Sequence, residues 1–180
     1  MIRQIIHKIS TWKIYRFIND WAMQYRLIPE SEYANPLNGC KKVLDIGCGR
    51  GYFFRDGWVG IDKDRKYKSN KIKIADATKL PFKKNSFDGV FCCALMEHLT
   101  YQQNIKMFKE VWRVLKPKGK FLLIIPHKER GLWDNPEHLR SYTLQAIKHL
   151  IEWNNIFFSI AEHEEVAWNS YRVLLIKKSK

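Results

Sequence analysis

Cysteine and long apolar runs are both scarce in this chain, and each shortage narrows the class of protein. No run approaches the roughly 20 apolar residues that a membrane-spanning helix needs, and the first residues lack the compact apolar core of a secretory signal. The cysteines fit neither a disulfide framework nor the spaced pairs of a zinc site. We therefore expect a soluble, cytoplasmic protein without a metal site, in which these thiols are reduced: Cys40, Cys48, Cys92 and Cys93.

Acidic residues are also few relative to basic ones. The chain has 18 aspartates and glutamates against 32 lysines and arginines, which gives a formal net charge of +14. Such a charge attracts polyanions such as nucleic acid, anionic lipid or charged glycan. It equally fits lysine-rich solvated surfaces, because the lysines are spread along the chain. The charge therefore leaves open both an anionic partner and a role in solubility or thermal adaptation.

A short N-terminal segment differs from the rest of the chain in its pattern of apolar and charged residues. Isoleucines and aromatic residues recur at three- and four-residue spacing over residues 1–28, among arginines and lysines, which predicts amphipathic helices. Prolines, asparagines and a glycine interrupt the pattern before Cys40 and indicate a connector. We therefore divide the chain into an amphipathic helical lid and connector, residues 1–38, and one main domain, residues 39–180.

Apolar runs that end in glycine or aspartate dominate the main domain. Unalternated apolar runs of this length are typical of strands buried on both faces, which favours a parallel sheet. Two helices and two late strands follow from helical spacing, from a capping threonine at position 143 and from further apolar runs. The expected strands are 43–46, 58–61, 72–75, 87–94, 121–125, 156–160 and 171–176, and the helices are 104–115 and 143–153.

This order predicts an α/β, Rossmann-like fold. The central sheet should be mostly parallel, with helices on both faces and the two late strands closing it as an antiparallel, hairpin-like edge. The span from Gly51 to Val59 leaves about eight residues for the first crossover, fewer than the roughly ten to twelve that a full one needs. We therefore expect the first crossover helix to be a single turn or to be missing.

The segment from Val43 to Gly51 is the most informative part of the sequence. A buried strand runs into glycines at positions 47, 49 and 51, where the backbone can turn sharply and approach a ligand. Asp45 lies two residues before the first of these glycines. A carboxylate at this place repels phosphates and attracts a cationic amino group. The turn therefore favours a nucleoside that carries an amino acid over a dinucleotide.

Two more aspartates end the next two predicted strands. Asp62 can accept both hydroxyls of a ribose, and Asp76 can accept a hydrogen bond from an adenine amino group. Ligands of open α/β sheets lie across the carboxyl ends of the strands. We therefore expect the three aspartates to converge on one crevice, although a single aspartate there would be an ordinary strand terminator.

The region from Val43 to about Pro126 resembles the class I methyltransferases that use S-adenosylmethionine. The resemblance is to the large group with a Leu-Pro-Phe segment after the third strand, and it is specific as to cofactor but not as to methyl acceptor. A later stretch, 134–143, is similar to the Asp-Pro-x-His stretch of many members. The other matching motifs are Leu80–Phe82, Ser86–Val90, Met96–Leu99 and Arg113–Lys120.

The resemblance implies that residues 39–180 form a methyltransferase domain with S-adenosylmethionine as cofactor. The glycines would lie under the methionine part and Asp45 near its amino group. Asp62 would bind the ribose, Asp76 and Ala77 the adenine, and residues 93–95 would pass beside the sulfonium. The implied cofactor-binding residues are Asp45, Gly47, Cys48, Gly49, Gly51, Asp62, Lys63, Asp76, Ala77, Cys93, Ala94 and Leu95. Lys118 departs from the family, which usually has glycine there, and we expect a harmless change in a turn.

A general base is needed only when the acceptor must lose a proton, as a hydroxyl must. The candidates are Glu97, His98 and His138, with Tyr142 and His127 as further ones. We prefer the histidines at 98 and 138, because a neutral imidazole accepts a proton near pH 7. Each has an ordinary structural alternative: helix capping for the glutamate, and packing or a backbone hydrogen bond for the histidines.

Three functions remain open at this point. The first is O-methylation of a small molecule, glycan or lipid, with the N-terminal segment acting as a lid or resting on an anionic membrane surface. The second is methylation of RNA, which the net charge favours and the lack of a separate RNA-binding module disfavours. The third is a silent, methyltransferase-like scaffold subunit, against which the intact aspartates argue.

Overall fold

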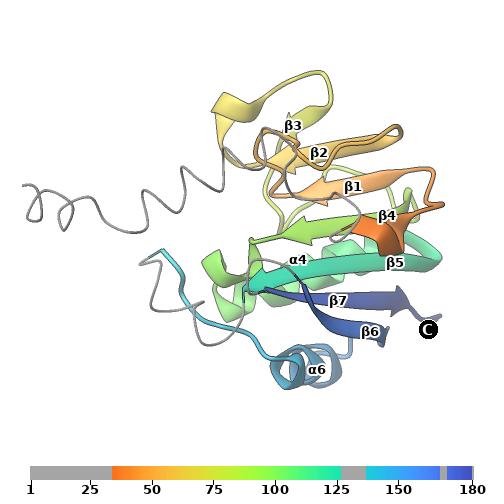
Figure 1. The fold of residues 1–180 in the computed structure, drawn as a ribbon, viewed down its shortest axis with the longest axis vertical. Coiled ribbons are helices and arrows are strands. Elements are labelled where there is room, and N and C mark those ends of the chain that lie inside the picture. Colours follow the sequence, from red (N-terminus) through yellow and green to blue (C-terminus); the bar gives the residue numbers. More distant parts are fainter. Residues whose placement is uncertain (1–33, 127–136, 167–169, 180) are drawn as a thin grey trace, which may run out of the picture.

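Seven strands form one sheet at the centre of the molecule (Figure 1). The computed structural model describes residues 34–126, 137–166 and 170–179, so the predicted helical lid over residues 1–28 lies outside the described part. The strands lie in the order β3-β2-β1-β4-β5-β7-β6. Their bounds are β1 Val43–Ile46, β2 Trp58–Asp62, β3 Ile72–Ile74, β4 Phe87–Cys93, β5 Leu115–Pro126, β6 Phe158–Val166 and β7 Ser170–Lys177.

The pairing confirms the predicted α/β, Rossmann-like sheet. Strands β1 to β5 pair in parallel, with Asp45 opposite Gly60 on β2 and Ile46 opposite Cys92 on β4. Strand β7 runs antiparallel to both β5 and β6, so the two late strands close one end of the sheet. Strand β5 begins at Leu115, earlier than expected, because Leu115 pairs with Phe87 before the register shifts.

Two α-helices follow the predicted capping and spacing. Helix α4, Tyr101–Val114, begins before the predicted Asn104 because Thr100 and Gln103 form a capping box. Helix α6, Leu144–Trp153, begins after Thr143, whose hydroxyl accepts a hydrogen bond from the amide of Ala146. None of the helices in the described ranges has the length and apolarity needed to cross a bilayer.

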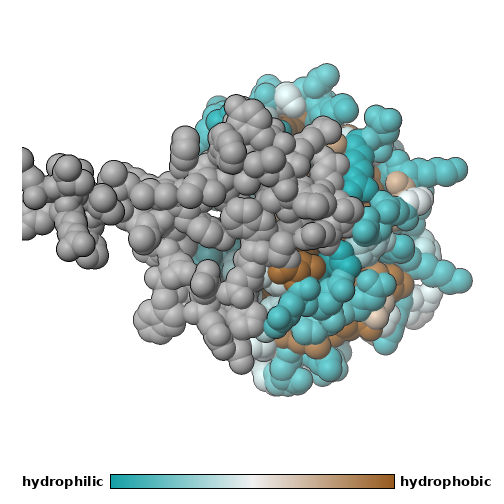
Figure 2. All heavy atoms as spheres, in the orientation of Figure 1, coloured by the Kyte–Doolittle hydropathy of each residue, from teal (hydrophilic) through white to brown (hydrophobic). Residues whose placement is uncertain are grey.

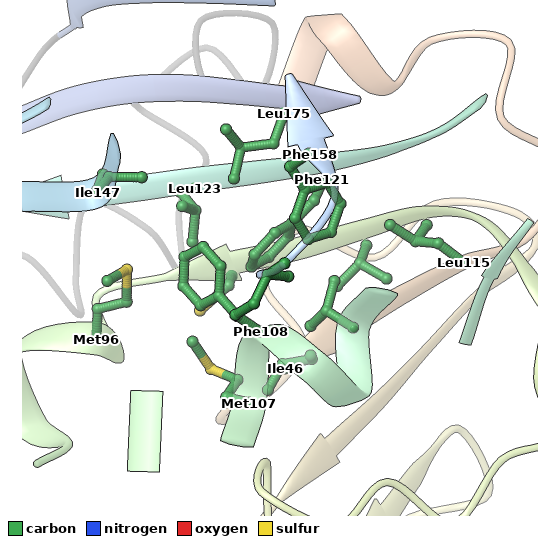
Figure 3. Packing of buried hydrophobic residues seen from close by; sticks show 14 of the residues in the cluster. Ile46, Met96, Met107, Phe108, Leu115, Phe121, Leu123, Ile147, Phe158 and Leu175 are labelled. Atoms are coloured by element: carbon green, nitrogen blue, oxygen red, sulfur yellow. The ribbon is translucent and has the colours of Figure 1, made fainter. Parts of the chain in front are cut away.

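Helices cover both faces of the sheet, but unequally. Both α4 and α6 bury their apolar sides in the larger core, where Phe108 packs edge-on against Phe121 with ring centroids 5.2 Å apart (Figure 3). On the opposite face, the short 3-10 helix η1, Asn35–Leu37, buries Leu37 in a smaller cluster. The surface in Figure 2 is largely hydrophilic over the described residues, with smaller apolar areas between them.

The first crossover contains no helix, as the sequence predicts. The chain from Gly47 to Gly57 forms only turns and short irregular stretches between β1 and β2. Phe53 takes part in covering the sheet there, with its ring edge-on against Phe91 at 4.9 Å. The next connection carries a 3-10 helix, η2, Arg65–Tyr67, capped by the carboxylate of Asp64. The turn after β1 is therefore flanked by loops and a single helical turn.

The backbone conformation at Lys118 explains why the family that this chain resembles usually has glycine at this position. Its φ is +62°, a left-handed conformation that is unfavourable for a residue with a Cβ atom. We expect Lys118→Gly to stabilise the fold by about 0.5–1 kcal/mol, since the relieved strain exceeds the added entropy of the unfolded chain. Chemical denaturation measures the change. Lys118→Ala is the matched control, because it removes the charge and keeps the strain; equal stability of the two variants would contradict this explanation.

Candidate cofactor and acceptor site

The glycine turn after β1 is held against β2 by backbone hydrogen bonds. The amides of Gly47 and Cys48 both donate to the carbonyl of Ile61, at 2.9 and 3.1 Å. Gly51 has a φ of +73°, and a Cβ atom there would lie 2.9 Å from the Phe54 ring. Glycine is required at this position because both backbone and neighbours exclude a side chain.

Gly60 on β2 belongs to the same arrangement, although sequence reasoning did not single it out. A Cβ atom on Gly60 would lie 2.4 Å from the Cys48 sulfur and 2.6 Å from the Phe54 ring. The missing side chain therefore makes room for the glycine turn to pack on β2. The signal was present in the run Val59-Gly60-Ile61, since a glycine inside a buried strand marks a close approach.

Asp45 is a buried carboxyl group with an unsatisfied oxygen. The residue is 1% exposed, and its Oδ2 has no hydrogen-bond partner among the described residues. Burial, followed by the nearby charge of Asp62, raises the pKa of Asp45 to about 8. A buried carboxyl without a donor is costly, so this oxygen is suited to a cationic ligand group.

Asp62 and Asp76 are oriented by local hydrogen bonds at the ends of β2 and beyond β3. The two oxygens of Asp62 accept from the amides of Gly49, at 2.9 Å, and Asp64, at 2.8 Å. Asp76 is exposed and accepts from the hydroxyl and amide of Thr78. These hydrogen bonds, the side-chain one first, lower the pKa of Asp76. Asp76 therefore remains a carboxylate that can accept hydrogen bonds.

A pocket of about 440 Å³ opens at the glycine turn. This volume lies within the range of roughly 300–1,000 Å³ that small-molecule sites occupy. Six predicted cofactor residues line it: Asp45, Gly47, Cys48, Gly49, Cys93 and Ala94. The others are not in its lining: Gly51, Asp62, Lys63, Asp76, Ala77 and Leu95.

Sequence reasoning missed nearly half of the pocket lining. The residues that it missed are Arg50, Tyr52, Phe53, Lys66 and Tyr67. Arg50 lies within the glycine turn, and Tyr52 and Phe53 follow it directly, in the crossover that has no helix. The other two belong to η2, which only the three-dimensional fold brings to this place. The aromatic run after Gly51 was the one local signal for them.

The residues at this pocket fit S-adenosylmethionine. Asp45, whose Oδ2 has no hydrogen-bond partner among the described residues, lines the pocket together with Gly47 and Gly49, and a carboxylate there suits the ammonium group of the methionine part. Asp62 is fixed beside that turn by its hydrogen bond from Gly49, where a ribose can donate its hydroxyls. Of the three aspartates only Asp45 lines this pocket, whereas Asp62 reaches it through the Gly49 amide and Asp76 lies outside the lining.

Ala94 lies in the chain between this pocket and two of the predicted catalytic residues. It follows β4 with a φ of +51°, and its amide donates to the carbonyl of Ile124 at 3.0 Å. Non-glycine residues in this conformation are strained, and such strain gathers at functional sites. Immediately after it, the 3-10 helix η3, Met96–His98, carries Glu97 and His98. Burial raises the pKa of the neighbouring Cys93 thiol, so it is not a thiolate.

The three predicted catalytic residues lie together. Glu97 is 2% exposed, and its Oε1 lies 4.0 Å from Nε2 of His138. The rings of His98 and His138 meet edge-on, with centroids 4.7 Å apart. Neither oxygen of Glu97 has a hydrogen-bond partner in the described part of the chain, so this side chain caps no helix there. The amide of Leu139 donates to the Glu97 carbonyl at 2.8 Å and joins the two segments.

Burial controls the protonation of this group. It raises the pKa of Glu97 to about 7. Burial and, next, the charge of His138 lower the pKa of His98, so its imidazole is neutral at pH 7. Burial also raises the pKa of Tyr142, whose hydroxyl accepts a hydrogen bond from Asn104 at 2.7 Å. His127, the remaining candidate, lies outside the described residues.

Asn104 is a positioning residue that sequence reasoning missed. Its side-chain amide, buried at the start of α4, donates to Tyr142 and to the carbonyl of Met96 at 3.0 Å. It therefore connects α4, η3 and the segment before α6. Asn104 was expected only as the beginning of a helix, and its role could not be seen without the tertiary contacts.

The fold is that of the Rossmann-like methyltransferases. Residues 44–123 match the family model described as a methyltransferase domain. A crystal structure of a protein from Pyrococcus horikoshii superposes with a TM-score of 0.68 at 25% identity, over 86% of this chain and 91% of that one. A SAM-dependent methyltransferase from Archaeoglobus fulgidus superposes with a TM-score of 0.62 at 19% identity, over 90% of this chain and 94% of that one.

A tRNA (carboxymethyluridine(34)-5-O)-methyltransferase of Arabidopsis thaliana is 28% identical in an alignment that covers 66% of this chain and 34% of that protein. The chain spans 34% to 58% of the length of the first curated relatives that it matches. Residues 44–123 thus match a methyltransferase domain, within a fold that is shared with SAM-dependent methyltransferases.

Asp45→Asn tests the contact between the buried carboxyl and the cofactor. We expect the affinity for S-adenosylmethionine to fall about 10- to 100-fold, because a charge-assisted hydrogen bond contributes about 1.5–3 kcal/mol. The cofactor-free variant should melt at a higher temperature, since it lacks the buried carboxyl. Calorimetric titration and thermal melts measure both effects. Asp56→Asn, at an exposed position in the same crossover, is the control; an unchanged affinity of the Asp45 variant would refute the contact.

The raised pKa of Asp45 predicts how cofactor binding depends on pH. Near pH 7 the free protein holds a proton on Asp45, whose pKa is about 8. The cationic amino group favours the carboxylate, so binding releases this proton, and affinity rises up to about tenfold per pH unit until pH reaches the pKa. Titrations in buffers of different ionisation enthalpy count the protons. A wild-type affinity that is flat between about pH 6 and 8 would rule out this coupling.

Proposed function

We propose that this domain transfers the methyl group to an oxygen atom of RNA. The observation that supports O-methylation is the group of Glu97, His98 and His138, which stands one helical turn beyond the pocket-lining Ala94. S-adenosylmethionine, when bound, supplies a methyl group that is attached to a positively charged sulfur. The thioether that remains after transfer is a good leaving group. The residues of the chain then have to align the acceptor, exclude water and take a proton.

The side chains divide these tasks. Asp45 and the glycine turn hold the methionine end, and the strained backbone at Ala94 fixes the end of β4 beside it. An acceptor hydroxyl that approaches from the η3 side meets Glu97 and His138, which can take its proton as the new oxygen–carbon bond forms. Asn104 keeps η3 in place through the Met96 carbonyl. These residues supply the general base that methylation of a hydroxyl needs. Methylation of a more acidic group does not need one.

Two observations favour RNA as the acceptor. The net charge of +14 suits a polyanion, and Arg50 and Lys66 bring part of that charge to the pocket itself. The relative from Arabidopsis thaliana carries a name that specifies tRNA and an oxygen of a carboxymethyl group, so it favours RNA but does not bear on the need for a base. These observations move the preference away from the small-molecule, glycan or lipid acceptor that the sequence first suggested. That acceptor, with the N-terminal segment on an anionic membrane surface, remains the competing proposal.

Methyl transfer from radiolabelled S-adenosylmethionine distinguishes the acceptors. We expect label in purified tRNA or total RNA, and RNA binding in a mobility-shift assay that weakens steeply as salt increases. Label in lipid or glycan extracts with none in RNA would instead establish the competing acceptor. A protein that binds the cofactor and labels none of these would be the silent subunit.

Glu97→Gln tests the proposed proton acceptor. Removal of a general base lowers the rate by about 10²- to 10⁴-fold, and we expect kcat to fall in this range with little change in cofactor affinity. Single-turnover assays across pH measure the loss. His163→Asn is a control because His163 is exposed on β6, away from the site. Full activity of the Glu97 variant would show that the acceptor needs no such group.

A further inference from the structure

The group beside the cofactor pocket has the composition of a metal site. Glu97, His98 and His138 each offer one nitrogen or oxygen atom, and these atoms all lie within 4.8 Å of one another. We propose that the three residues bind one divalent transition-metal ion, and that this ion holds the acceptor oxygen beside the methyl group. The binding of the ion stands on its own, whereas its contact with the acceptor rests on the proposed O-methylation. The sequence alone predicted no metal site.

The carboxylate of Glu97 is the strongest argument for a cation. It is 2% exposed, and among the described residues neither oxygen accepts a hydrogen bond. A buried carboxyl in this state loses its hydration without compensation. The distance of 4.0 Å from its Oε1 to Nε2 of His138 is too long for a hydrogen bond. Two ligands that bind one ion at about 2.0–2.2 Å lie roughly 3 Å apart, so a movement of about 1 Å would complete the pair.

The surroundings of the two histidines also suit metal binding. The His98 ring forms a hydrogen bond with the backbone of Glu137, which fixes its orientation and leaves the second ring nitrogen for another partner. Metal-binding histidines usually have such an outer hydrogen bond. The His98 and His138 rings stand at 79° to each other, so they can approach one ion from different directions. The hydrogen bond from Leu139 to the Glu97 carbonyl holds both segments together.

The ligand set indicates the class of ion. Two imidazoles and one carboxylate suit Zn²⁺, Mn²⁺, Fe²⁺ or Co²⁺, and they leave coordination positions open. An acceptor hydroxyl that occupies an open position would lose its proton more easily, because a bound cation lowers the pKa of its oxygen ligands. In that arrangement Glu97 and the histidines act as ligands instead of proton acceptors, so the ion activates the hydroxyl and its proton passes to solvent water.

Cobalt binding tests the site without reference to activity. The full chain is freed of metal with a chelator and titrated with Co²⁺, followed by visible absorption and calorimetry. We expect one ion per chain, and at least about a tenfold weaker affinity in Glu97→Gln and His138→Asn. His163→Asn on exposed β6 should bind Co²⁺ as the wild type does. Each variant is also titrated with S-adenosylmethionine, whose unchanged affinity shows that the domain remains folded.

Two outcomes would overturn the metal site. One is a wild-type chain that binds no Co²⁺, or binds it equally well after Glu97→Gln. The other is a sulfur-to-cobalt charge-transfer band, which would place the ion on the thiols. Failure of the proposed function looks different: Co²⁺ binds as expected, yet no RNA is methylated. If RNA is methylated at full rate in the presence of chelator, the contact between ion and acceptor is wrong and O-methylation still stands.

Discussion

The buried carboxyl of Asp45, whose Oδ2 has no hydrogen-bond donor among the described residues, is the constraint on which the rest of the site depends. Strand β1 is enclosed between β2 and β4, so its last residues cannot reach solvent. The carboxyl group therefore sits in a low-dielectric environment beside Asp62, and both effects oppose its ionisation. A cation in the adjoining pocket reverses this penalty. The domain accordingly gives up stability in the cofactor-free state for affinity toward a positively charged ligand.

The order of the strands places different groups on the two sides of Asp45. Because β2 and β3 lie on one side of β1, Asp62 and Asp76, the predicted ribose and adenine ligands, lie in that direction. Because β4 lies on the other side, its end at Ala94 carries the chain toward Glu97 and His98. The crossover without a helix leaves the glycine turn covered by short loops. Cofactor recognition and acceptor chemistry thus meet where β1 and β4 end.

The sequence predicted the elements and residues whose signals are local. Apolar runs located the strands, and glycines after β1 located the turn, because backbone conformation and burial are encoded at those positions themselves. Lys66 was missed as a pocket residue because η2 reaches the pocket only through the folded connection between β2 and β3. Asn104 was missed because its function lies in contacts with η3 and Tyr142. For the same reason Glu97 and His138 were predicted singly, and their proximity emerged only in three dimensions.

A crystal structure with bound S-adenosylhomocysteine is the most direct measurement of the central claim. It should show the amino group of the ligand within about 3.2 Å of the Asp45 carboxylate. The ribose should lie at Asp62, and the sulfur should point along Ala94 toward Glu97. A ligand whose amino group lies away from Asp45, with that carboxyl still lacking a partner, would contradict the account.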